Sequence, residues 1–182
     1  MNILYNKKLA AAILVIVILG TILLCGGRSL ANARARQAQL FYTGTSDDGN
    51  SIANDLHVRC ESGHNLMTVA RRYMEANAPE LKALETAVAA LEGAAGPSEA
   101  FEANYAVTLA ADHLYSVLNN MQLTDADKKL VSGQFTEMTS RNQTISHDGY
   151  NVKAAEFNEL LKRFPTNIIA AAGGVAPLEL FR

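Results

Sequence analysis

The hydrophobic pattern of the chain begins with a long run that contains no charge. All nineteen residues from Leu9 to Gly27 are uncharged and most are aliphatic, with two lysines before the run and an arginine after it. A helix of this length covers about 28 Å, close to the ~30 Å hydrocarbon core of a bilayer. Because lipid offers the backbone no hydrogen bonds, a single segment satisfies its own polar groups there only as a helix. We therefore predict a transmembrane helix over residues 9–27, after a short basic segment over residues 1–8.

Two other interpretations of this run stay open. A secretory signal peptide would end at small residues, and residues 31–35 fit that pattern loosely, although arginines crowd them several positions past the run. A lipoprotein would be modified at Cys25, but the bulky Leu24 stands before it where a small residue is expected. Basic residues flank both ends in similar number, so the charge pattern only slightly favours an amino terminus inside and an exported body.

The rest of the chain has the pattern of helices and lacks cleanly alternating strand segments. Residues 28–42 can extend the anchor helix, and a Gly-, Ser- and Asp-rich breaker cluster follows at residues 43–50. Proline and glycine then separate the apolar segments, and Thr124 resembles an N-cap with an acid three residues on. We predict further helices at residues 51–77, 79–92, 98–121 and 125–164.

Apolar stripes on the later segments indicate how these helices pack. Alternating spacings of four and three residues are typical of a helix face that contacts neighbouring helices. One stripe consists of Ala103, Val107, Ala110, Leu114, Val117 and Met121, and a second of Val131, Phe135, Met138, Asn142, Ile145, Gly149 and Val152. Together with the short connections, they predict an all-α fold: an N-terminal transmembrane helix, a juxtamembrane helix and loop over residues 28–50, and an elongated antiparallel up-and-down bundle over residues 51–182. The bundle has four helices, or three if the segments on either side of Pro79 join.

Composition and candidate chemistry narrow the function. The formal net charge is −2, so nothing indicates a nucleic-acid partner. His57, Glu61 and His64 share a helix face, and Glu-x-x-His is a spacing that di-iron bundles use. Such sites need a second copy of the motif, which the sequence lacks, so a metal-binding bundle on these residues is a minor alternative. We expect no enzyme, no catalytic residue, no metal and no cofactor.

The C-terminal part contains the most specific pattern. Three pairs follow one another at intervals of seven residues, and Asn167 comes soon after the last: Tyr150-Asn151, Phe157-Asn158 and Phe164-Pro165. A second segment contains Arg59, Glu61, Asn65 and Leu66. Both resemble the LemA family, whose members end in a YN…FN…FPxNxIA…G…P…F pattern and contain an R-x-D-x-x-P-N-L segment. His64 replaces the proline of that segment.

The resemblance implies a non-enzymatic, membrane-tethered helical scaffold or adaptor in the inner membrane of a bacterial envelope. Its partners would be the lipid bilayer through residues 9–27 and other membrane proteins or further copies of itself. Members often neighbour membrane proteases in genomes, which implies an alternative role in membrane protein quality control or envelope stress. The aromatic residues of the heptad are expected to pack in the core, with Asn151 and Asn158 at the edge of the seam; a docking groove for another protein's helix is the other interpretation.

Overall fold

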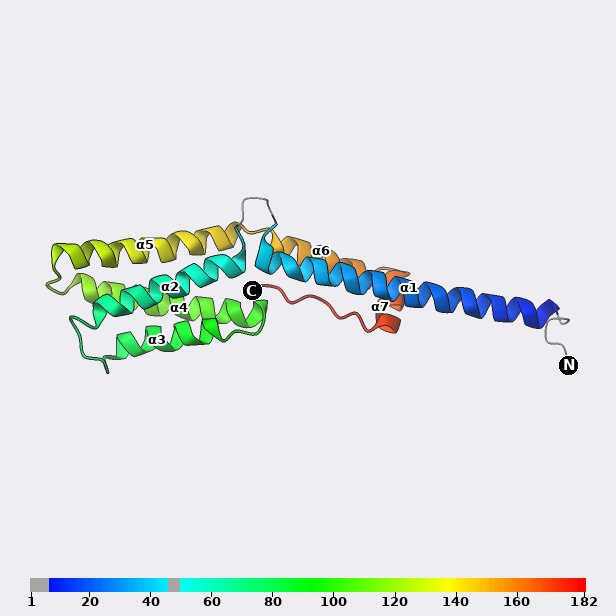
Figure 1. Cartoon of the computed structure of the whole chain (residues 1–182), viewed down its shortest axis with the longest axis horizontal. Helices are drawn as coiled ribbons and strands as arrows, with labels where there is room; N and C mark the ends of the chain where they lie inside the picture. Colours follow the sequence, from blue (N-terminus) through cyan, green and yellow to red (C-terminus); the bar gives the residue numbers. More distant parts are fainter. Residues whose placement is uncertain (1–6, 46–49) are drawn as a thin grey trace. The chain divides into compact units, whose positions relative to one another are not determined.

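The computed structural model describes residues 7–45 and 50–182, and every regular element in those ranges is an α-helix. The prediction of an all-α fold is thus confirmed. The predicted segment over residues 1–8 and the breaker cluster at residues 43–50 lie partly outside the described residues. The helices are α1 (Lys7–Thr43), α2 (Ile52–Ala70), α3 (Pro79–Glu92), α4 (Pro97–Asn119), α5 (Asp125–His147), α6 (Tyr150–Lys162) and α7 (Thr166–Gly173) (Figure 1).

The chain divides into two compact units, which we describe separately. Unit 1 comprises residues 1–38 and 152–178, and unit 2 comprises residues 39–151 and 179–182. Most of α1, most of α6 and the whole of α7 therefore belong to unit 1, whereas α2 to α5 belong to unit 2. The chain passes between the units within α1, within α6 and in the C-terminal tail.

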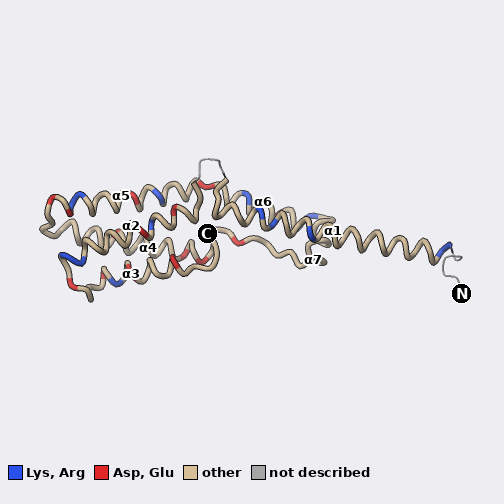
Figure 2. Tube along the Cα trace, in the orientation of Figure 1, with Lys and Arg blue, Asp and Glu red and all other residues tan. Residues whose placement is uncertain are grey.

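Helix α1 contains the apolar run and continues beyond it without a break, as predicted for residues 28–42. It is long and apolar enough to cross a membrane, and none of its most apolar window is buried inside the protein. Ile16 and Leu24, for example, are 68% and 75% exposed. Figure 2 shows this part of α1 as a long stretch without charged residues. Exposed aliphatic surface of this extent marks a contact with lipid or with another protein.

In unit 1, α7 approaches α1 closely at two consecutive glycines. A Cβ placed on Gly26 would lie 2.9 Å from the side chain of Ile169, and one placed on Gly173 would lie 2.9 Å from the Cα of Gly27. The absence of side chains thus allows the two backbones to meet. After α7, the Arg34 guanidinium donates hydrogen bonds to two carbonyls of the tail.

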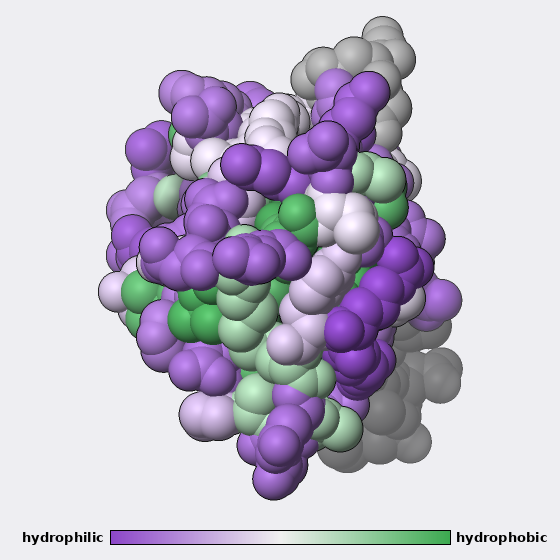
Figure 3. Space-filling model, turned by 90° about the vertical axis from the view of Figure 1, so that its left-hand side faces the viewer, coloured by the Kyte–Doolittle hydropathy of each residue, from purple (hydrophilic) through white to green (hydrophobic). Residues whose placement is uncertain are grey.

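Unit 2 is built around α2, which packs against α5 and α3, while α3 packs against α4. Gly63 permits the close approach of α2 to α3, because a Cβ there would lie 2.9 Å from Val88. The aliphatic side chains that point inward are fully buried; among them are Leu66, Leu81, Leu84, Val107, Leu114 and Leu118. Viewed from the end with the α2–α3 and α4–α5 connections, the surface is mainly hydrophilic, as expected for a face in water (Figure 3).

Two helix boundaries differ from the prediction. Helix α2 ends at Ala70 rather than near residue 77, so turn residues separate it from α3 and the two do not form one helix across Pro79. Helix α4 begins at Pro97, with Gly96 rather than Ser98 as its N-cap. Proline suits the first helical position because it has no N–H to leave unpaired.

The predicted helix over residues 125–164 is also wrong, because it breaks between α5 and α6. Asp148 accepts a hydrogen bond from the N–H of Tyr150 at 2.7 Å, and this contact between side chain and backbone marks the start of the second helix. Gly149 lies close to Thr45, leaving no room for a larger residue. Asp-Gly is a turn dipeptide, so the sequence contained the signal.

The predicted stripe on α4 was correct at three positions only. Ala103, Val107 and Leu114 are buried, but Ala111 and Leu118 replace the predicted Ala110 and Val117 in the core. The face that packs inward therefore drifts by one residue along the helix, as expected for a straight helix read against a strict heptad. In the second stripe, Val131, Met138 and Ile145 of α5 are buried as predicted, but Phe135 and Asn142 are half-buried. Val152, on α6, is 60% exposed, because the stripe does not continue across the break.

Candidate interaction sites

Arg59 of the second motif lies in the middle of unit 2 and is only 1% exposed. Its Nη1 donates to the carbonyl of Met138 on α5 at 3.0 Å, and its Nη2 donates to the Thr108 hydroxyl on α4 at 2.8 Å. One side chain thus connects three helices. The hydrogen-bond partners that the described residues supply, a carbonyl and a hydroxyl, are both uncharged.

Burial without a carboxylate partner is unfavourable for an arginine. Loss of hydration lowers the pKa of Arg59 well below its ordinary value, to about 10, although electrostatic interactions with Cys60 and Asp112 act in the opposite direction. A shift of that size corresponds to about 3 kcal/mol of unfavourable free energy in the charged form. Helical proteins bury such a charge when it fixes one arrangement or serves a ligand.

A groove between α4 and α5 lies directly beside this arginine. One hollow of about 150 Å³ has Arg59 and Thr108 among its lining residues, and a second of about 420 Å³ continues it past Asn142 toward Phe101. Phe135, which lines the smaller hollow, stacks on Tyr115 with ring centroids 3.9 Å apart. The lining of the groove therefore combines aromatic and aliphatic side chains with arginine, threonine, asparagine and aspartate side chains.

Two buried polar atoms of this groove have no hydrogen-bond partner among the described residues. They are the Nε donor of Arg59 and the Oδ1 acceptor of Asn104. The amide nitrogen of Asn104 donates across the groove to Oδ1 of Asn142 at 3.1 Å. Buried polar groups are nearly always paired, so an unpaired donor and an unpaired acceptor among the residues that line one groove are unusual.

A second polar cluster lies where α2 ends and α5 begins. Asp127 accepts hydrogen bonds from the Tyr73 hydroxyl and from Arg72, and its backbone N–H donates to the Thr124 hydroxyl that caps α5, as predicted. The Tyr73 hydrogen bond, more than Thr124 or Arg72, lowers the pKa of Asp127. Asn65, the other polar motif residue on α2, is exposed and donates to Gln134 at 3.2 Å. These contacts hold α2 against α5.

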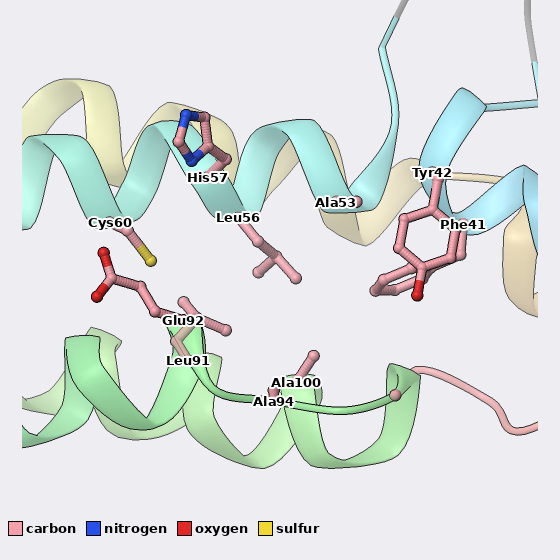
Figure 4. Close-up of a pocket in the computed structure, with 11 residues that line it drawn as sticks. Phe41, Tyr42, Ala53, Leu56, His57, Cys60, Leu91, Glu92, Ala94 and Ala100 are labelled. Carbon is pink, nitrogen blue, oxygen red and sulfur yellow. The ribbon is translucent and has the colours of Figure 1, made fainter.

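A third hollow, of about 250 Å³, lies between α2 and α3 near residues 41 and 42 (Figure 4). Cys60 and Glu92 face it, and His57 is also part of its lining, which resembles the residue set of a cysteine hydrolase. Burial, and after it the charge of Glu92, raises the pKa of Cys60 to about 11. The thiol is therefore protonated at neutral pH, whereas nucleophilic catalysis needs the thiolate.

The histidine face predicted from the sequence does not gather into a metal site. The His57 ring pairs with Glu61 at 3.5 Å, and the His64 ring pairs with Glu92 of α3 at 2.9 Å. All four side chains are largely exposed. In the part of the chain that the structure describes, no group of three His, Cys, Asp or Glu side chains could hold a metal ion.

The heptad residues in unit 2 bind the end of the chain. Tyr150 is buried, and its hydroxyl donates to the Glu179 carbonyl at 2.8 Å. The side-chain amide of Asn151 donates to the Phe181 carbonyl and accepts from the Phe181 N–H, both at 2.8 Å. Phe181 packs edge-on against Phe101, with centroids 5.3 Å apart. The Asn151 side chain thus satisfies both backbone hydrogen-bonding groups of Phe181, as the backbone of a neighbouring β-strand does in a sheet.

The same recognition occurs in unit 1. Asn158 donates to the Leu178 carbonyl at 2.9 Å and accepts from the Leu178 N–H at 2.7 Å, beside the buried Phe157. Seven helical residues rise about 10.5 Å, and three extended residues span about 10 Å, so the spacing of the two asparagines matches that of residues 178 and 181. The sequence predicted the asparagines at a packing seam but missed that the chain's own tail is their partner.

The last motif residues lie at the surface of unit 1. Phe164 was predicted to continue the buried stripe of α6, but α6 ends at Lys162 and Phe164 is 80% exposed. Pro165 stands just before α7 as its N-cap residue. Asn167 is exposed, and its Oδ1 accepts from the N–H of Ile168. These residues therefore shape the start of α7 rather than the core.

Comparison with known proteins agrees with the motifs. The model of the LemA family matches residues 49–182, which is more than half of the chain and includes both motif segments. No curated protein and no solved structure matches the sequence. On the strength of the family match, this chain belongs to the LemA family.

Proposed function

We propose that this protein is a non-enzymatic, single-pass membrane scaffold whose helical body binds other membrane proteins or further copies of itself. The observation that carries the proposal is the α4–α5 groove, with its aromatic walls and the unpaired polar atoms of Arg59 and Asn104. Protein-binding surfaces combine aromatic side chains with a few well-placed hydrogen-bond groups in this way. A peptide amide offers both the acceptor and the donor that these two atoms need.

Residues 9–27 of α1 serve as the membrane anchor in this proposal. Their exposed aliphatic side chains support it, because the protein itself does not cover them. We place the protein in the inner membrane of a bacterial envelope with its body exported. Helices α2 to α5 then form an antiparallel four-helix bundle that displays the groove to partners.

The absence of an enzymatic role rests on the chemistry of the hollows. The Cys60 thiol is held in its protonated form, and the pairs of His57 with Glu61 and of His64 with Glu92 engage both rings. The remaining groove is lined by an arginine and amides together with Asp112 and Asp148, and neither a histidine nor a thiol is among its lining residues.

The experiment is photo-crosslinking in native membranes from a single position on the rim of the groove. Tyr105 lines the groove and is 58% exposed, so a photoreactive phenylalanine analogue fits there without disturbing the core. Leu130, which is 48% exposed on α5 and does not line the groove, is the matched control position. We expect light-dependent adducts from position 105 in excess of those from position 130, and we expect Asn104→Leu to reduce them.

Equal adducts from both positions, or none, would contradict the proposed groove. Mass spectrometry identifies the protein in each adduct. A second copy of this chain would support self-assembly, and a different membrane protein would support an adaptor role. A membrane protease among the adducts would favour the role in protein quality control.

A further inference from the structure

A surface of unit 1, separate from the groove, shares the apolar character of the anchor. The chain from Phe164 to Leu178 contains no charged residue, and α7 lies within it. Its exposed members include Phe164 at 80% and Ile168 at 52%. A short helix of a protein in water rarely exposes large apolar side chains side by side, so this surface needs a partner.

The position of α7 identifies that partner. Ile169 and Gly173 contact Gly26 and Gly27, which are the last two residues of the apolar run. If that run spans the hydrocarbon core, its end marks the boundary between acyl chains and headgroups. A helix fixed beside that end lies at the interface, where short amphipathic segments place aromatic and aliphatic side chains.

Charge around α7 points to the same surface. Outside the apolar run, unit 1 has six basic side chains and two acidic ones, counted over residues 28–38 and 152–178. Figure 2 shows basic positions on α6, and Arg163 immediately precedes the uncharged segment. Basic residues next to an apolar anchor attract anionic headgroups over about one Debye length.

We infer that Phe164 and α7 form a second membrane contact, an interfacial helix that inserts at the surface of an anionic phospholipid bilayer beside the anchor. The inference rests on the proposed anchor but not on the groove. The anchor holds the helix at the right depth, Phe164 and Ile168 enter the acyl boundary, and Arg28 and Arg163 meet the headgroup phosphates. The contact would attach unit 1 to the membrane at a second point beside the anchor.

The test uses the fact that the sequence contains no tryptophan. Phe164→Trp and Ile168→Trp in the full chain each introduce one fluorophore at the surface in question. Leu130→Trp, 48% exposed in unit 2, is the matched control. Each variant is reconstituted in vesicles of phosphatidylcholine with phosphatidylglycerol, with bromine on the acyl chains of a fraction of the lipids, and flotation first checks that the protein is inserted.

We expect bromine to quench the fluorescence of Phe164→Trp and of Ile168→Trp at least about twofold more strongly than that of the control, with emission shifted to the blue. Arg28→Gln with Arg163→Gln should lower that quenching, as should vesicles without phosphatidylglycerol. If the protein floats with the vesicles but bromine quenches both variants no more than the control, the inference is wrong while the proposed anchor is still supported. Blue-shifted emission without quenching would overturn it too, because the surface would then be covered by protein. Failure to float would overturn the anchor itself.

Discussion

The two units of this chain differ in where they place their large apolar side chains. Unit 2 turns its leucines and valines inward around α2, whereas unit 1 leaves aliphatic residues of α1 and α7 at the surface. Their charges differ as well: unit 1 has eight basic and two acidic side chains, and unit 2 has eight basic and sixteen acidic ones. A net charge of −2 for the whole chain hides this separation. This distribution of apolar surface and charge is the one expected if part of unit 1 lies in lipid and unit 2 lies in water.

The two units also differ in how their helices contact one another. In unit 1, glycines bring α1 and α7 into backbone contact, which helices in membranes use because lipid offers no hydrophobic driving force between them. In unit 2, hydrogen bonds and buried ion pairs specify the packing; the pair between Arg141 and the buried Asp55, at 3.0 Å, is one example. Substitutions at the glycines of unit 1 and at the polar side chains of unit 2 therefore test whether the two units are stabilised in different ways.

The largest effect is expected at Arg59. Arg59→Ala removes a buried side chain that connects three helices and leaves a cavity, so the free energy of unfolding of unit 2 should fall by about 3 kcal/mol or more. Arg59→Met keeps most of the volume without the buried charge, so the free energy of unfolding should fall by much less. Urea denaturation followed by circular dichroism measures both. If the methionine variant is stable but forms no crosslink from position 105, the arginine is needed for binding rather than for folding. If both variants lose the same free energy of unfolding, the buried charge of Arg59 is not itself unfavourable, which would contradict the account.

A smaller loss is expected at the contact of α1 with α7. Gly173→Ala places a methyl group 2.9 Å from the Cα of Gly27, so α7 must move, at a cost of about 1–3 kcal/mol. Gly133→Ala is the matched control, since nothing lies within 4 Å of that position and alanine should stabilise α5 by about 0.5–1 kcal/mol. Hydrogen exchange of residues 166–173 reports the first change. Unchanged protection of α7 in Gly173→Ala would contradict the close helix contact.

The two asparagines should each hold a different part of the tail. Asn158→Ala removes two hydrogen bonds to Leu178 in unit 1, and Asn151→Ala removes two to Phe181 in unit 2. Each loss should weaken local protection by about 1–2 kcal/mol, which corresponds to roughly tenfold faster exchange of the amide concerned. Asn120→Ala, which removes a bond within α4 only, is the control. If either variant speeds exchange throughout residues 174–182, the two asparagines do not hold separate parts of the tail, and the prediction is wrong.

A pH dependence is expected from Asp127. Because its pKa is lowered in the folded protein, its stabilising effect is complete above the unfolded value of about 3.9 and disappears as the pH falls through the folded value. Asp127→Asn should therefore destabilise unit 2 at pH 7, and the difference from the parent protein should shrink on acidification. Denaturation midpoints at several pH values measure this. A difference that does not change with pH would contradict the lowered pKa.

Much of the fold follows from the sequence because its signals are local. The apolar run, the Thr124 cap and proline at residues 79 and 97 depend on neighbouring residues, and the structure has helices where they occur. The break at Asp148 and Gly149 was overlooked because the apolar rhythm continues across it. The partners of Asn151 and Asn158 could not be predicted, since they are backbone groups thirty and twenty residues away in the sequence. The groove also depends on the spacing of α4 and α5, which no local pattern specifies.

The most direct test of a chain divided between lipid and water is fractionation of the full-length protein after an alkaline wash of native membranes, with the intact mass of the recovered chain. We predict that the protein stays with the membranes and keeps residues 9–27, and that protease added to washed vesicles of one orientation releases α2 to α5 while a lipid-protected fragment of α1 remains. A soluble chain that begins downstream of Gly27 would contradict the account.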